Sequence, residues 1–211
     1  MTPTAQIQRF LGGENPLCAL NRSRRRPPRL LFPGAFNPLH WAHRQMAEIA
    51  SELRGEPAEF ELSIENVDKA TLDLQEIERR LQQFSAHQPV WLTRAPTFAE
   101  KSAQFPGATF VVGSDTLRRI AQPKYYGGDP QAVIAAVRSI SDNDCRLLVF
   151  GRLIEDAFRT LDDLSVAEPL KQICDSVPES VFRADISSTL LRQVLRQTEQ
   201  ETHRPKRELD G

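Results

Sequence analysis

The chain has 211 residues, of which 40% are hydrophobic and 26% charged, and its formal net charge is −1. This length suits one compact domain with a sizeable core, and the balanced charge excludes a global basic field that would favour nucleic acid as a partner. The three cysteines are far apart and form no CxxC pair, which excludes a disulfide framework or a zinc cage and is typical of a reducing cytosol.

The two ends of the chain lack the hydrophobic periodicity of folded elements. We expect an irregular leader over residues 1–28, a folded domain over residues 29–198 and a polar tail over residues 199–211. The leader ends in the basic stretch Arg22–Arg26, which we interpret as a solvated charge run; an arm that touches phosphate or a partner is the alternative. No apolar run is long enough to cross a bilayer, and the signal-peptide order is missing, so we expect a cytoplasmic protein without membrane contacts.

Between these ends, strand and helix patterns alternate along the chain. The first strand is predicted over Arg29–Phe32, and a helix with apolar residues at helical spacing follows from His40 to Glu52. The later elements are expected in this order: strand Glu59–Ser63, helix Leu74–Phe84, strands Val90–Thr93 and Thr109–Val112, helix Gln131–Ile140, strand Arg146–Phe150, a brief strand Val181–Arg183, and a last helix from Ser187. The pattern predicts an α/β, Rossmann-like fold: a mostly parallel sheet with helices on both faces.

The segment between the first strand and the first helix carries the strongest motif. It reads Gly34-Ala-Phe-Asn-Pro-Leu-His40-Trp-Ala-His43. Gly34 is expected to let the backbone pass close to a ligand, and the helix start offers free N–H groups and partial positive charge for a phosphate. His40 and His43 lie on the first helical turn, where two imidazoles can donate hydrogen bonds to phosphate oxygens. Zinc is the rival ligand for this pair, but it usually needs three or four protein ligands, so we expect no metal held by the chain.

A second motif opens the last predicted helix. It reads Asp185-Ile-Ser-Ser-Thr-Leu-Leu-Arg192. Ser187 is a suitable N-cap, and Ser188 and Arg192 are four residues apart, so they share one face of the helix. Because helical side chains lean toward the N-terminus, Arg192 can reach an anion held at the first turn. Two helix N-termini can thus grip one triphosphate from two sides.

The two motifs together resemble the nucleotidyltransferase superfamily, also called cytidylyltransferase-like, with signatures G-x-F-x-P-x-H-x-G-H and I-S-S-T-x-x-R. Thr109–Asp115, with its Gly-Ser-Asp ending, is similar to a segment of nicotinamide or nicotinate mononucleotide adenylyltransferases. The resemblance implies a nucleotidyltransferase of NAD biosynthesis that moves AMP from ATP to a phosphorylated acceptor, with Mg²⁺ carried by ATP. It implies nucleotide contacts from Gly34, Ala35, Phe36, His40, His43, Gly113, Asp115, Ile186, Ser187, Ser188, Thr189 and Arg192, with His40, His43 and Arg192 catalytic.

Acceptor contacts are expected beyond the ends of the predicted strands. Lys69 follows the second strand and could hold the acceptor's phosphate; a surface lysine is the alternative. Trp91 could stack on a pyridine ring, with core packing as the alternative, and Thr93 ends the same strand. Asp115 could accept a hydrogen bond from a ribose hydroxyl. The expected partners are ATP and this small acceptor, and the sequence is compatible with a homo-oligomer.

One position departs from the family's pattern. Ala42 stands where the signature has glycine, and its methyl group is expected to press on the adenine or its ribose. It leaves open a catalytically weak, nucleotide-binding regulatory protein. A second alternative keeps the transfer and changes the acceptor, to phosphopantetheine or to a phosphorylated alcohol with CTP, because relatives with those activities share the first signature. Pyrophosphate release separates the first from the leading hypothesis, and a nucleotide panel separates the second.

Overall fold

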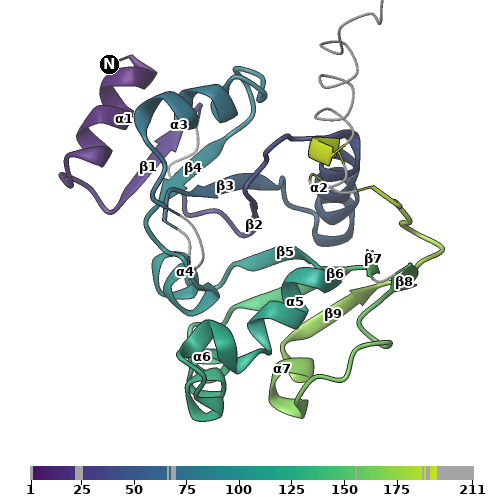
Figure 1. Cartoon of the computed structure of the whole chain (residues 1–211). Helices are drawn as coiled ribbons and strands as arrows, with labels where there is room; N and C mark the ends of the chain where they lie inside the picture. The colour runs from purple at the N-terminus through teal and green to yellow at the C-terminus, as the bar shows by residue number, and fades with distance from the viewer. Residues whose placement is uncertain are drawn as a thin grey trace, which may run out of the picture.

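The computed structural model describes residues 2–21, 26–65, 67, 70–154, 156–186, 188 and 191–193. In this part of the chain a seven-stranded sheet has the order β1-β4-β3-β2-β5-β6-β9 (Figure 1). Its strands are β1 (Leu17–Leu20), β2 (Leu30–Pro33), β3 (Glu59–Ser63), β4 (Val90–Thr93), β5 (Thr109–Gly113), β6 (Arg146–Phe150) and β9 (Cys174–Val177). All neighbouring pairs are parallel except β1 with β4. The predicted mostly parallel α/β sheet is confirmed.

Helices cover both faces of this sheet because neighbouring strand residues point to opposite sides. On one face, Leu30 and Phe32 of β2 pack with Met46 of α2 (Trp41–Arg54). On the other face, Leu31 packs in a second cluster with α5 (Ser114–Ile120), α6 (Pro130–Asp142) and α7 (Glu168–Gln172). The remaining elements are α3 (Leu74–Leu81), α4 (Phe98–Gln104), the 3-10 helix η1 (Pro123–Tyr126), and a hairpin of β7 (Arg152–Ile154) and β8 (Ala157–Arg159).

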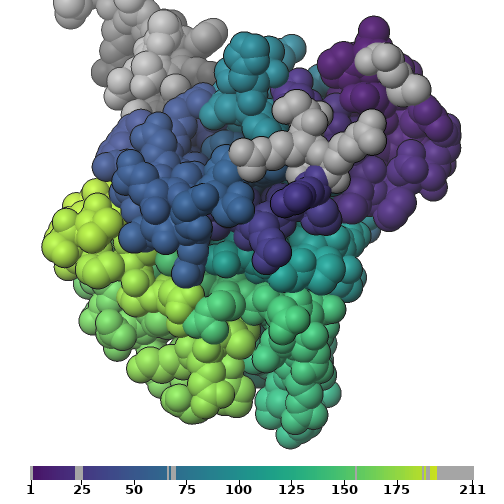
Figure 2. Space-filling view, turned by 180° about the vertical axis from the view of Figure 1, so that it is seen from behind, coloured from purple at the N-terminus to yellow at the C-terminus, as the bar shows by residue number. Residues whose placement is uncertain are grey.

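The expectation of an irregular leader is wrong for most of its length. Residues Pro3–Leu11 form α1, whose Ile7 and Phe10 are buried, and β1 follows as an antiparallel strand on β4. A third core cluster joins these residues to Leu62 of β3, which explains why a short amphipathic segment folds here. The space-filling view places the purple N-terminal segment at the opposite end of the molecule from the yellow-green residues near β9 (Figure 2). Within the basic stretch, residues 22–25 lie outside the described residues.

The last predicted strand is also wrong in position. The structure has no strand at Val181–Arg183; the edge strand is β9, which pairs with β6 in parallel. Phe182 is nevertheless 2% exposed, because its side chain packs in the core without belonging to the sheet. Of the last predicted helix, residue 188 and residues 191–193 are described, and they are helical. None of the helices in the described ranges is long and apolar enough to span a membrane.

Candidate functional site

The first motif forms the loop from β2 to α2, and its conformation depends on a close contact between Gly34 and Phe36. Phe36 has a φ of +45°, in the left-handed region, and its ring folds back over Gly34. A Cβ on Gly34 would lie 2.6 Å from Cζ of that ring, which is 1% exposed and packs edge-on against Phe32 and Phe60. Gly34 is therefore required by the packing of Phe36, whereas the sequence had suggested ligand approach as the reason.

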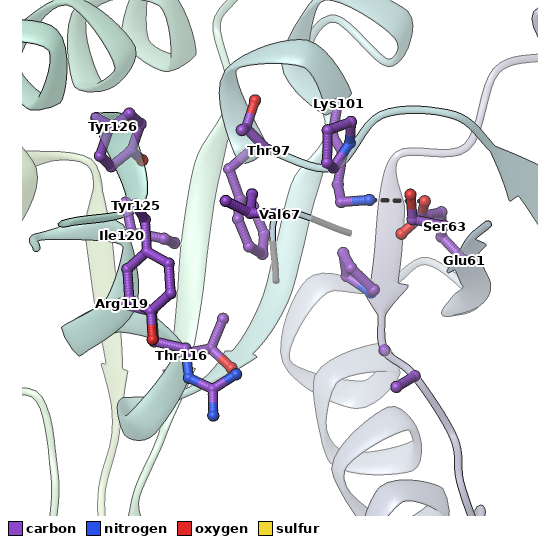
Figure 3. Close-up of a pocket in the computed structure, with 15 residues that line it drawn as sticks. Glu61, Ser63, Val67, Thr97, Lys101, Thr116, Arg119, Ile120, Tyr125 and Tyr126 are labelled. Carbon is purple, nitrogen blue, oxygen red and sulfur yellow. Dashed lines mark hydrogen bonds and ion pairs between the residues drawn. The ribbon is translucent and has the colours of Figure 1, made fainter. Parts of the chain in front are cut away.

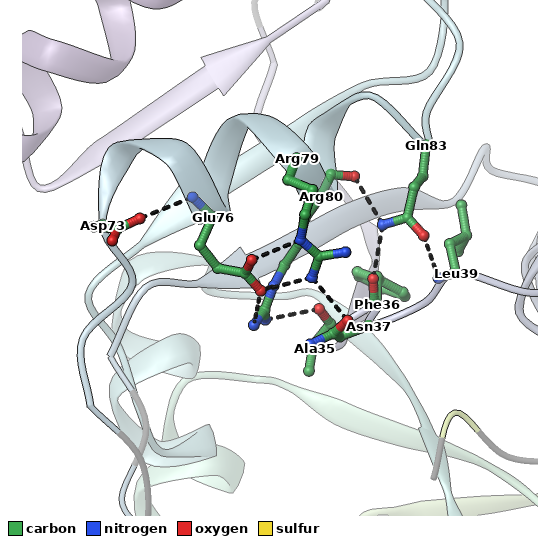
Figure 4. Close-up of polar contacts among 9 residues, drawn as sticks. All are labelled: Ala35, Phe36, Asn37, Leu39, Asp73, Glu76, Arg79, Arg80 and Gln83. Atoms are coloured by element: carbon green, nitrogen blue, oxygen red, sulfur yellow. Dashed lines mark hydrogen bonds and ion pairs between the residues drawn. The ribbon is translucent and has the colours of Figure 1, made fainter. Parts of the chain in front are cut away.

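Helix α3 and the residues after it hold this loop by hydrogen bonds to its backbone (Figure 4). Arg80, which is 7% exposed, donates from Nη1 to the carbonyl of Ala35 at 2.9 Å. The Gln83 amide donates to the carbonyl of Phe36 at 2.9 Å and accepts from the backbone N–H of Leu39 at 2.8 Å. Further side-chain contacts at this place join Glu76, Arg79 and Asn37. The loop is thus fixed before any ligand binds, which lowers the entropy cost of positioning one.

His40 and His43 form a stacked pair at the start of α2. Their ring centroids are 3.6 Å apart, and Nδ1 of His43 accepts from the backbone N–H of His40 at 3.3 Å. Burial, and to a smaller extent Arg152, lowers the pKa of His40 from 6.5 to about 4. Burial, then His40, then Arg152, lowers the pKa of His43 to about 3. Both rings are therefore neutral at pH 7, and each still has one N–H to donate.

The His40 ring lacks the partners that a buried imidazole normally has. His40 is 7% exposed, and neither of its ring nitrogens has a hydrogen-bond partner among the described residues. A buried polar group without a partner costs free energy, on the order of 1–3 kcal/mol. A ligand that supplies hydrogen-bonding oxygens at this place would recover that free energy, as a phosphate does.

Arg152 belongs to the same cluster, although it lies outside both sequence motifs. It begins β7, directly after β6 and Gly151, and its Nε lies 3.8 Å from Oδ1 of Asp115. Its Nη1 is buried without a hydrogen-bond partner in the described part of the chain. A Cβ on Gly113 would lie 2.4 Å from Oδ1 of Asp115 and 2.9 Å from Cγ of Arg152. The absence of a side chain at Gly113 therefore leaves room for both side chains beside the end of β5. The signal in the sequence was an arginine just beyond a buried strand's carboxyl end.

The second motif contacts the first directly. The Ser188 hydroxyl donates to the carbonyl of Pro38 at 2.9 Å, and Nη1 of Arg192 donates to the carbonyl of Asn37. Ile186 packs against the core cluster that contains Phe36. The predicted meeting of the two motifs is therefore present in the fold. Ser187 and Thr189 lie outside the described residues.

A cavity of about 240 Å³ opens beside the first motif. It adjoins the motif through Gly34 and Ala35. Its walls come from the ends of β2 and β3, from the loop that follows β4, and from α4, α5 and η1. Glu61, Ser63 and Lys101 lie on one side, and Arg119, Tyr125 and Tyr126 lie on the other (Figure 3). Helix α5 begins right after Gly113, so this cavity and the histidine cluster share the carboxyl edge of the sheet.

The predicted acceptor residues do not lie together at one place in the structure. The indole of Trp91 donates to Glu59 at 2.7 Å and packs against Phe105, so it serves the core and does not line the cavity. Thr93 is fully buried, and its hydroxyl donates to Glu61, a cavity residue. Asp115 reaches the histidine cluster through Arg152. Lys69 lies outside the described residues.

Ala42, the departure from the signature, is fully buried in the core cluster that also contains Met46. Its methyl group packs against hydrophobic residues of that cluster. Among the described residues, no group of three or more His, Cys, Asp or Glu side chains gathers at one place to hold a metal ion.

Comparison with known families matches this architecture. Residues 31–194 match the model of a family described as cytidylyltransferase-like. The chain belongs to the cytidylyltransferase-like family. The matched range begins in β2 and ends two residues after the second motif, so it contains both motifs, the histidine cluster and the cavity. Membership in this family identifies the protein as a nucleotidyltransferase. A comparison with curated proteins finds no match.

Proposed function

We propose that this cytidylyltransferase-like protein transfers AMP from ATP to nicotinamide or nicotinate mononucleotide and releases pyrophosphate. The observation that carries the proposal is the cluster of His40, His43 and Arg152, in which buried nitrogens of His40 and Arg152 have no hydrogen-bond partner among the described residues. Oxygens of a triphosphate supply the missing partners. The Gly113–Asp115 segment, whose carboxylate lies beside Arg152, is the support for a mononucleotide acceptor.

The reaction needs no nucleophile from the protein. A phosphate oxygen of the acceptor attacks the α-phosphorus of ATP in line, a new P–O bond forms, and the bond to the leaving pyrophosphate breaks. Catalysis of this kind consists mainly of positioning and of stabilising the charge on phosphate oxygens. His40 and His43 donate hydrogen bonds to these oxygens, and Arg152 and Arg192 place positive charge near them.

Mg²⁺ is proposed to enter with ATP. The ion usually keeps several waters and binds phosphate oxygens plus one or two carboxylates, so it needs no dedicated protein cage. The residues present fit this requirement, because the carboxylate of Asp115 is about half exposed beside the cluster. When bound, the ion would offset the charge of the triphosphate.

The cavity beside the first motif is proposed as the acceptor site. Its volume, about 240 Å³, lies just under the range of about 300–1,000 Å³ for drug-sized ligands and suits a compact molecule. Tyr125 and Tyr126 supply aromatic surface for a pyridine ring, and Arg119 supplies positive charge on the same wall. Because Gly34 and Ala35 belong to both sites, an acceptor held here lies next to the donor.

The direct test incubates pure protein with ATP, Mg²⁺ and either mononucleotide, and measures dinucleotide and pyrophosphate. We expect both products in equal amounts; absence of dinucleotide with both acceptors refutes the proposal. His43→Ala should lower kcat far more than it weakens ATP binding, because hydrogen bonds to a leaving pyrophosphate strengthen in the transition state. Equal losses in kcat and in binding would contradict that role.

A panel of nucleotides in thermal-shift measurements separates ATP from CTP as the donor. Stabilisation by CTP and not by ATP would favour the cytidylyltransferase alternative. The regulatory alternative requires ATP binding without pyrophosphate release, restored by Ala42→Gly. The buried position of Ala42 favours the transferase, because its methyl group fills protein space and Ala42→Gly should lower stability without raising activity.

A further inference from the structure

Three buried polar residues are joined by hydrogen bonds at the cavity; two of them line it, and neither motif includes them. Lys101 of α4 is 4% exposed and Glu61 of β3 is 0% exposed, and Nζ of the lysine lies 2.7 Å from Oε1 of the glutamate. The hydroxyl of Thr93 donates to the same oxygen, and Nζ also donates to the carbonyl of Ala95 at 2.7 Å. Glu61 and Lys101 line the cavity together (Figure 3).

Both members of this ion pair retain unused hydrogen-bonding capacity. Oε2 of Glu61 is buried and has no hydrogen-bond partner among the described residues. An ammonium group has three N–H donors, and Lys101 has two hydrogen bonds within the described part of the chain. A buried ion pair adds little to stability compared with apolar packing, and an unpaired carboxylate oxygen costs free energy. The pair therefore makes better sense as a site for a ligand than as a stabilising contact.

We infer that Glu61 and Lys101 recognise a neutral carboxamide on the acceptor, and so select nicotinamide over nicotinate mononucleotide. A primary amide has an N–H donor for Oε2 of Glu61 and a carbonyl oxygen for the free N–H of Lys101. A carboxylate has no donor for Glu61, and it brings a second negative charge beside a lysine whose charge Glu61 already balances. The inference rests on the proposed function and goes beyond it by choosing between its two acceptors.

The size of the preference follows from the cost of an unpaired buried group. That cost, on the order of 1–3 kcal/mol, corresponds to about fivefold to about 150-fold in relative affinity. Sites that bind a polar substrate group by hydrogen bonds reject analogues without that group for the same reason. The expected ratio of kcat/KM for the amide acceptor over the acid acceptor is therefore at least about fivefold.

The experiment measures kcat/KM for both mononucleotides at saturating ATP, and binding of each by calorimetry, in the wild type, Glu61→Gln and Glu61→Gln/Lys101→Met. Because the glutamine side chain has an N–H₂ group that can donate to a carboxylate, Glu61→Gln should lower the amide-to-acid ratio about fivefold or more. The double variant avoids an unpaired buried lysine, so it keeps the test valid if the single variant folds poorly. Glu59→Gln is the matched control: this glutamate lies on the same strand, is 3% exposed, and bonds Trp91 away from the cavity.

The outcomes separate the two proposals. Equal kcat/KM for both acceptors, or a ratio that Glu61→Gln and the double variant leave unchanged, overturns the selection by Glu61 and Lys101 while the transferase function stands. A ratio that Glu59→Gln shifts as much as Glu61→Gln overturns it as well. If the wild type neither turns over nor binds either mononucleotide, both the proposed function and this inference are refuted.

Discussion

Acidification should destabilise this protein before its carboxylates titrate, because of the stacked histidines. His40 has a pKa of 6.5 in a model peptide and about 4 in the folded chain. Between these values the unfolded chain binds more protons than the folded one. The contribution of His40 to the free energy of unfolding is therefore fully present above pH 6.5 and is lost as the pH drops toward 4. Each pKa unit corresponds to about 1.4 kcal/mol, so His40 alone contributes about 3 kcal/mol over this window. His43 acts in the same direction, with its pKa at about 3.

Urea unfolding at pH values from about 7 to about 4.5 measures this loss. The range stops there because Glu76, whose pKa falls from 4.5 to about 2 through its bonds with Arg79 and Arg80, would add its own loss below pH 4.5. His40→Asn should reduce the slope of stability against pH, and His40→Asn/His43→Asn should reduce it further. His87→Asn, which removes an exposed histidine away from the pair, is the control. An equal change of slope in the His40 and His87 variants would refute the reasoning.

Three further substitutions test the loop and the cluster. Gly34→Ala should destabilise the fold by about 1–3 kcal/mol in urea unfolding, because its Cβ would lie 2.6 Å from the buried Phe36 ring; no loss would contradict the packing. Gln83→Met should lower the free energy of unfolding by about 1–3 kcal/mol, because it leaves loop backbone groups unpaired. The control Gln82→Met, at an exposed position, should change it by no more than about 0.5 kcal/mol. Equal effects of the two substitutions would argue against the loop contacts. Arg152→Gln should raise the Kd for ATP about tenfold in calorimetry; an unchanged Kd would remove this residue from the proposed nucleotide site.

Local sequence patterns predicted the central part of the fold well. Strands Glu59–Ser63, Val90–Thr93 and Arg146–Phe150 were predicted with the observed bounds, because the first alternates polar and apolar residues and the other two are mainly apolar runs. The edge strand β9 was missed because Asp175 and Ser176 break its apolar pattern. The strand predicted at Val181–Arg183 is instead a loop in which Phe182 alone of the three residues is buried. Edge strands have one free side and tolerate such polar residues, so periodicity is a poor guide to them.

The candidate site was predictable where its residues are contiguous in sequence. Gly34–His43 carries its own turn, helix start and imidazoles within ten positions. Glu61 and Lys101 are forty residues apart, and Glu61 looked like the polar half of an alternating strand, although both residues are buried. Arg152 is likewise far from the histidines in sequence, and the fold brings it to them at the point where the chain passes from β6 to β7. Long-range pairs of this kind come from the topology, which a single sequence does not encode locally.

The antiparallel strand β1 also covers the edge of β4, which a second molecule could otherwise pair with. It pairs with β4 over Leu17–Leu20, and it lies before residue 31, where the family match begins. Without it, the backbone N–H and C=O groups along Val90–Thr93 would stand open at the end of a hydrophobic sheet and could pair with a second molecule. A protein shortened to the matched residues would thus retain both motifs and still be prone to aggregate. Expression of this enzyme for biochemical work should therefore keep the first 20 residues.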